Sequence, residues 1–81
     1  MPKLPRISGS DVVKVLERLN FIQVRQTGSH AVLKKPILDE DGAKVGEIVC
    51  VVPLHRELKI GTLSGVLRLA QVTPEEFIEN L

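Results

Sequence analysis

Aromatic residues are almost missing from this chain, which has no tryptophan, no tyrosine and only two phenylalanines, Phe21 and Phe77. This scarcity argues against a nucleic-acid-binding module that stacks bases on aromatic side chains. Hydrophobic residues still make up 43% of the chain. The core therefore has to be built mainly from valine, leucine and isoleucine.

Cysteine and long apolar runs are scarce as well. The single cysteine, Cys50, lies in the apolar run of residues 48–52 and has no partner for an internal disulfide, as is usual in a reducing cytoplasm. We expect it to be buried as a small hydrophobic side chain. No apolar run approaches the roughly 20 residues of a membrane span, and the first residues lack the apolar segment of a signal peptide. We therefore predict a cytoplasmic protein without a membrane partner.

Positive charge is concentrated in the first part of the chain. Residues 1–35 hold seven lysines and arginines against two acids, whereas residues 36–81 hold four against eight. A basic half can form a phosphate-binding face, although an ordinary solvated surface explains the same distribution. A chain of 81 residues is the size of one small domain. We assign residues 1–81 to a single domain that starts with an irregular basic arm over residues 1–7.

A helix is the first predicted element. It begins at Ser8 or Ser10, in a stretch typical of a helix start. Apolar residues at helical spacing continue it to Leu19, while charged side chains take its other side. Asn20 is expected to end the helix, because asparagine tolerates the left-handed backbone conformation.

The first predicted strand covers residues 21–26, where apolar and polar side chains alternate. This alternation indicates a half-buried strand, with Ile22 and Val24 on the buried face. Gln23 and Arg25 are then expected on the other face, open to solvent or a partner.

Two further strands are predicted over residues 30–35 and 44–52. The polar loop between them ends in Asp41-Gly42, the strongest short turn signal in the chain. Strands joined by short loops pair antiparallel. The apolar stretch of the third strand is continuous, which favours the central or best-covered position in the sheet.

Two helices are predicted after the sheet. Thr62 is the expected N-cap of the first, and apolar residues at helical spacing follow it. Thr73 and Pro74 then form a strong start for a short C-terminal helix, which Phe77 and Leu81 are expected to dock against the core. The predicted fold class is α+β: an α-β-β-β-α order with a short final helix and helices covering one face of a three-stranded antiparallel sheet.

The most distinctive stretch of the chain delivers a histidine to the start of the second strand. Gly28 and Ser29 form a turn immediately before His30, one of only two histidines. Imidazole titrates near neutral pH, with a usual pKa of roughly 6.5, so it can give or take a proton. Without further context, a histidine at a strand start is an ordinary exposed polar residue.

Five short signatures follow one another along the chain. They are Ser8-Gly9, Leu19-Asn20-Phe21, Arg25-Gln26-Thr27-Gly28-Ser29-His30, Val52-Pro53-Leu54-His55 and Lys59-Ile60-Gly61-Thr62-Leu63. In this order and spacing they resemble the HicA (YcfA-like) toxin family of HicAB toxin–antitoxin systems. The resemblance covers nearly all of the chain and implies a fold similar to double-stranded-RNA-binding domains.

The resemblance also implies an activity and a partner. Members of the family are endoribonucleases that cleave mRNA as toxins of type II systems, and a HicB-like antitoxin neutralises them. It implies that His30 is the catalytic residue and that no cofactor is needed; Gly28 and Ser29 match the same motif. His55 matches a recurrent histidine of the family. Contact with DNA is expected only through the antitoxin.

Metal-free RNA cleavage needs a base for the 2′-hydroxyl proton, an acid for the leaving oxygen and positive charge near the phosphate. His30 is the candidate acid or base. His55 is a candidate second proton carrier or phosphate contact, or simply a hydrogen-bonded end of the third strand.

Candidate RNA-binding residues surround this histidine in the sequence. Lys34 lies on the same strand face as His30 if the pairing is regular. Arg25 and Lys35 are further candidates, but the faces on which they lie depend on the strand register. Gly28 and Ser29 complete the set, because glycine permits a tight or positive-φ backbone there and the serine hydroxyl can bond locally or reach a ligand.

Two alternatives and one departure from the family's pattern bear on this interpretation. A metal site built from His30, Cys50 and His55 is disfavoured, since these residues lack the closely set pairs of zinc sites. A non-catalytic RNA-binding module of the same fold is the alternative function, although Lys59 is the only basic residue just before the second helix. The acidic stretch of residues 36–42 is longer than the family's usual loop, and it either points away from RNA or alters the choice of substrate.

Overall fold

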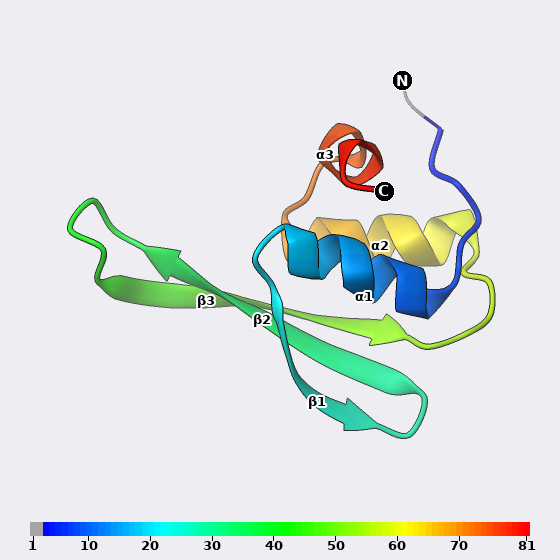
Figure 1. Ribbon diagram of the computed structural model, residues 1–81, viewed down its shortest axis with the longest axis horizontal. Helices are drawn as coiled ribbons and strands as arrows, with labels where there is room; N and C mark the ends of the chain where they lie inside the picture. Colours follow the sequence, from blue (N-terminus) through cyan, green and yellow to red (C-terminus); the bar gives the residue numbers. More distant parts are fainter. Residues whose placement is uncertain (1–2) are drawn as a thin grey trace.

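Along the chain, one helix precedes three antiparallel strands and two helices follow them (Figure 1). The computed structural model describes residues 3–81, so that Met1 and Pro2 of the predicted arm lie outside the described residues. The α+β prediction is confirmed. The elements are α1 (Gly9–Arg18), β1 (Ile22–Thr27), β2 (His30–Leu38), β3 (Lys44–Pro53), α2 (Ile60–Ala70) and α3 (Pro74–Glu79).

The sheet has the order β1-β2-β3, and both hairpins are antiparallel. In Figure 1, α1 and α2 run side by side along one face of the sheet, and α3 lies beyond them. Of the two positions predicted for the third strand, central or best covered, the central one is wrong, because the two hairpins share β2 and leave β3 at an edge. The continuous apolar stretch of β3 has another cause: both α1 and α2 contact this strand.

The core is aliphatic, as the composition predicts. Along β2 and β3, alternate side chains point toward the helices, and Leu33 and Val52 are fully buried there. Both phenylalanines join this core, with Phe21 and Phe77 buried. Residues 3–7 have no regular secondary structure. Leu4 of this arm nevertheless packs against the core.

Two helix starts form as predicted. The side chain of Ser8, the N-cap of α1, accepts a hydrogen bond from the Asp11 amide at 3.1 Å. Asn20 adopts a left-handed φ of 75° just after α1. The start of α3 is a complete capping box, in which Thr73 and Glu76 satisfy each other's backbone amides.

Two details of the C-terminal helices differ from the prediction. The α2 helix begins at Ile60 with Lys59 as its N-cap, which makes no side-chain cap hydrogen bond, so Thr62 lies inside the helix. Phe77 docks α3 as expected, but Leu81 follows the last turn and is 52% exposed. No helix within residues 3–81 is both long and apolar enough to cross a membrane.

The first strand is not half-buried. All six residues of β1 are exposed, and Ile22 and Val24 are 62% and 51% exposed. The register explains why: Ile22 pairs with Lys34 on the face away from the helices, and Gln23 pairs with the buried Leu33. A β-bulge after Gln23 then changes the phase of the alternation, so that only Arg25 of the two predicted polar residues lies on the open face.

Candidate functional site

A two-residue turn places His30 at the start of β2. Thr27 and His30 are the last paired residues of the β1–β2 hairpin. Gly28, the first residue of the turn, has a φ of +55°, while Ser29 does not have a positive φ. Positive φ at the first position alone is the pattern of a type II′ turn, which favours glycine there and matches the twist of the strands.

His30 lies on the open face of the sheet, the face that α1 and α2 leave uncovered. Its neighbours Ala31 and Leu33 are fully buried toward the helices, so alternation along β2 turns His30 and Val32 the other way. The imidazole is exposed, and its Nδ1 lies 3.4 Å from the Ser29 hydroxyl. Within residues 3–81 no hydrogen bond engages Nε2, which leaves this nitrogen accessible to a ligand.

The first turn of α1 lies against the end of the sheet at which His30 is placed. Pro53 pairs with His30 across the β2–β3 hairpin, and the Leu54 amide donates to the Ser29 carbonyl at 2.6 Å. Gly9 lies so close to the end of β3 that a Cβ on this residue would collide with the Pro53 carbonyl oxygen. The separate Ser8-Gly9 and Val52-to-His55 signatures therefore meet in one place, which sequence spacing does not reveal.

His55 lies in the loop after β3. Its main-chain carbonyl accepts a hydrogen bond from the Gly9 amide at 2.9 Å, which ties the loop to α1. The residue is exposed. In the part of the chain that the structure describes, no hydrogen bond joins the imidazoles of His30 and His55.

The three basic candidates divide between the two faces of the sheet. Arg25 pairs with Val32, and Lys34 lies two residues further along β2, so both share the open face with His30. Lys35 lies on the covered face, with its ammonium 5.6 Å from the centre of the Phe21 ring. The structure therefore brings Arg25 and Lys34, but not Lys35, onto the face that carries His30.

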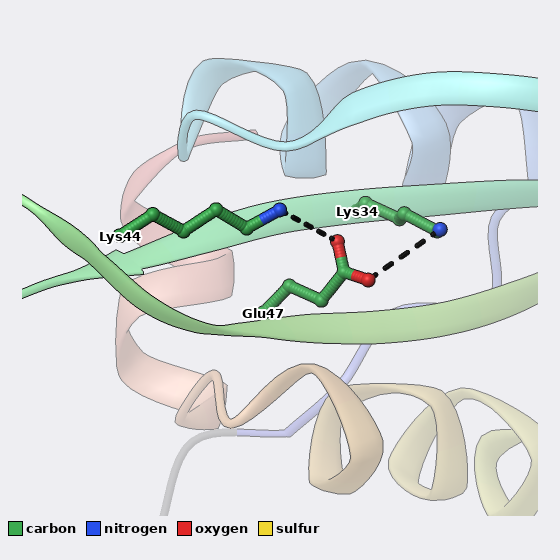
Figure 2. Close-up of polar contacts among 3 residues, drawn as sticks. All are labelled: Lys34, Lys44 and Glu47. Carbon is green, nitrogen blue, oxygen red and sulfur yellow. Dashed lines mark hydrogen bonds and ion pairs between the residues drawn. The ribbon is translucent and has the colours of Figure 1, made fainter.

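Lys34 is held by a residue that the sequence does not single out. Its ammonium lies 3.5 Å from Oε1 of Glu47 on β3, and the ammonium of Lys44 lies 3.4 Å from Oε2 (Figure 2). The hydrogen bond from Lys44 and the charge of Lys34 hold the pKa of the Glu47 carboxyl below its usual value. Glu47 is missed in the sequence because its position depends on the hairpin register. This register pairs Pro36 with Glu47 and so brings the carboxylate near Lys34.

The acidic loop lies far from His30. Residues 36–38 of the acidic stretch belong to β2, and the loop itself begins at Asp39, nine residues after His30, which corresponds to about 30 Å along an extended strand. In Figure 1 the β2–β3 hairpin projects beyond the helices, with this loop at its tip. Asp39 closes the loop by accepting hydrogen bonds from the amides of Asp41 and Ala43, both at 2.9 Å. The loop therefore lies at the opposite end of the hairpin from His30, next to Lys44.

Cys50 is buried, as predicted, with 1% of its surface exposed. Burial raises the pKa of its thiol to about 11, which keeps it protonated and unreactive at neutral pH. Within residues 3–81, no three or more histidine, cysteine and acidic side chains are grouped so that they could hold a metal ion.

The surface around His30 is open. The described surface has shallow depressions between α1 and β1, beside α1 and Leu81, and between α2 and α3, and neither histidine lines any of these. Small-molecule sites are concave and largely enclose their ligands. An exposed histidine beside two cations on an uncovered sheet face suits a long, anionic ligand better.

The comparisons with known proteins bear on the family of the chain. Among curated proteins, none matches the chain. The family model described as the HicA toxin of bacterial toxin–antitoxin systems matches residues 9–72, which is well over half of the chain and includes both histidines. The chain therefore belongs to the HicA toxin family of bacterial toxin–antitoxin systems, a membership that implies an antitoxin partner.

Proposed function

We propose that this protein is an mRNA-cleaving toxin, an endoribonuclease in which His30 acts as a general acid or base without a metal ion. The observation that carries the proposal is the exposed imidazole of His30 on the uncovered sheet face of a HicA-family chain. Arg25 and Lys34 on the same face supply positive charge for RNA phosphates. The turn at Gly28 and Ser29 leaves the backbone beside His30 open to a polymer.

The proposed reaction is internal transfer at one phosphate of the RNA. Nε2 of His30 takes the proton of the 2′-hydroxyl, the 2′-oxygen bonds to phosphorus, and the bond from phosphorus to the 5′-oxygen breaks. A second proton has to reach that leaving oxygen, and His55 or water is the candidate donor. One well-placed acid–base group contributes typically about 10²–10⁴-fold to such a reaction.

A HicB-like protein is the proposed antitoxin. The proposal for its identity rests on the family, whose members form toxin–antitoxin pairs. Binding of such a partner to the face that carries His30 and Arg25 would exclude RNA from the same surface. DNA contact, if the pair makes any, is assigned to the antitoxin.

Inducible expression tests the activity. Wild-type protein is expected to arrest growth and degrade RNA, and His30→Ala is expected to lower cleavage about 10²–10⁴-fold while keeping the fold, because the side chain is exposed. His55→Ala, examined in parallel, separates a second proton carrier from a structural residue. Growth, total RNA and cleavage by purified protein in EDTA are the measurements.

Each result bears on a separate part of the proposal. A wild-type protein that neither slows growth nor degrades RNA contradicts the toxin assignment. Undiminished cleavage by His30→Ala contradicts the assignment of the site. Loss of cleavage in EDTA contradicts metal-free chemistry. RNA binding without cleavage points to the non-catalytic module instead.

A further inference from the structure

The open face carries a second cluster of charge beyond His30. The carboxylate of Glu47 lies between the ammonium groups of Lys34 and Lys44, and each of its two oxygens forms an ion pair with one of these groups (Figure 2). Lys44 and Glu47 are three residues apart in the first part of β3, beside the loop at the tip of the projecting hairpin, and Lys34 reaches them from β2. Two cations therefore converge on a single two-oxygen anion, and the cluster keeps a net charge of +1.

Stability does not account for this arrangement. The side chains of Lys34 and Glu47 are 41% and 36% exposed, and that of Lys44 is 58% exposed. Exposed ion pairs contribute little to stability, since water screens them and ordering long side chains costs entropy. What the cluster does provide is a pair of ammonium groups already gathered around an anion.

The cluster lies in line with the site at His30. Lys34 is four residues from His30 on the same face, which is about 13 Å along the strand, and Arg25 lies between them opposite Val32. The cationic positions thus follow His30 in steps of about 7 Å, two strand residues each. This period is close to the separation of neighbouring phosphates in an extended RNA strand.

We propose that Lys34 and Lys44 form a phosphate subsite for RNA and that Glu47 occupies it as an internal competing anion. An RNA phosphate distant from the cleaved one replaces the Glu47 carboxylate between the two ammonium groups, and the carboxylate turns into solvent. This inference rests on the proposed function. It adds a binding position for long substrates and gives Glu47 the role of weakening RNA binding there.

Binding of a 2′-O-methyl oligoribonucleotide tests the subsite, because this probe has no 2′-hydroxyl and remains uncut. With a strand long enough to follow the whole open face, Glu47→Gln is expected to bind about two- to fivefold tighter than wild type, the effect of one freed surface charge. Its affinity should also fall more steeply with salt, by about 0.7 in the logarithmic slope for one added phosphate contact. Lys44→Gln is expected to bind about two- to fivefold more weakly.

Two controls separate a subsite from a general change in charge. Glu79→Gln on α3 removes the same charge beyond the helix layer (Figure 1) and should leave binding unchanged. A dinucleotide probe cannot span from His30 to Lys34, so the differences between the variants should be smaller for it than for the long probe. Thermal melting verifies the fold of each variant, as exposed substitutions usually change stability by less than about 0.5 kcal/mol.

The outcomes distinguish the subsite from the proposed function. If wild type binds the long probe but Glu47→Gln or Lys44→Gln binds no differently from Glu79→Gln, the subsite is wrong and the proposed function stands. Weaker binding by Glu47→Gln also overturns the subsite, because Glu47 would then be aiding RNA binding. If no variant binds the long probe, both proposals fail.

Discussion

Neighbouring residues of similar kind in the second half of β3 lie in opposite surroundings on the two faces of the sheet. On the covered face, Cys50 and Val52 are 1% and 0% exposed, whereas Val49 and Val51 on the open face are 43% and 41% exposed. All four lie within one strand. Residue type therefore does not decide which side of this sheet is the core; the helices that cover one side decide it.

The comparison also separates stability from function. The covered face holds no buried polar or charged residue within residues 3–81, so it gains its stability from apolar burial alone. The open face carries His30, Arg25 and the ion pairs of Glu47. Substitutions on the two faces should accordingly affect different properties, and three experiments test this.

The largest difference is expected between two neighbouring valines. Val52→Ala removes two buried methyl groups and should lower the free energy of unfolding by about 2–3 kcal/mol, through lost burial and the cavity left behind. Val51→Ala makes the same change on the open face and should cost less than about 1 kcal/mol, mainly through strand propensity. Urea unfolding of both variants measures the difference. Equal losses would mean that the open face is also packed in solution.

A second experiment tests the close contact between α1 and the end of the sheet. Gly9→Ala would push a methyl group into the Pro53 carbonyl and strain the bond from the Gly9 amide to His55. Overpacking of this kind costs about 1–3 kcal/mol. The same contact positions the end of β3 beside His30. RNA cleavage should therefore fall by more than the smaller amount of folded protein explains.

Gly65→Ala is the matched control for this glycine. Gly65 lies within α2, and apart from its chain neighbours and the nearby backbone of the same helix no atom lies within 4 Å of the position that a Cβ would take. Alanine there should raise stability by up to about 1 kcal/mol, since glycine is the poorer helix former. Thermal unfolding compares the two variants, and a Gly9→Ala protein as stable as Gly65→Ala would contradict the close contact.

The smallest effect on stability is expected for a substitution that tests thiol reactivity on the two faces. Cys50 is buried and its raised pKa keeps the thiol protonated, so it should resist iodoacetamide at pH 8 in the folded protein. Val51→Cys places a second thiol one residue away on the open face, where it should react readily. Mass spectrometry should then find one modified thiol in this variant and none in wild type, until denaturant exposes Cys50. Rapid labelling of folded wild type would contradict the covered position of Cys50.

Local signals predicted most of the elements correctly, because their causes are local. The capping box at Thr73 and the turn at Gly42, whose φ is +81°, involve residues close together in the chain. Errors arose where a distant contact decides. Ile22 lies on the open face because of its pairing with Lys34, and β3 lies at an edge because both hairpins share β2.

The candidate site divides in the same way. The turn before His30 and the histidine itself can be found in the sequence, and the resemblance to the HicA family adds their proposed chemistry. The sheet faces on which Arg25 and Lys35 lie cannot be found in the sequence. A bulge in β1 and the register of β2 decide them. The partnership of Glu47 with Lys34 depends on the same cross-strand register.

By itself, the sequence determined the order of helices and strands, the aliphatic core and the histidine delivered by the Gly28-Ser29 turn, since periodicity, capping and turn chemistry act over a few residues. Only the tertiary structure decided that β3 lies at an edge, that Gly9 approaches Pro53, and that two lysines meet at one carboxylate. The physical reason is that strand pairing and helix packing join residues far apart in the chain. A shift of one residue in pairing would place His30 on the opposite face.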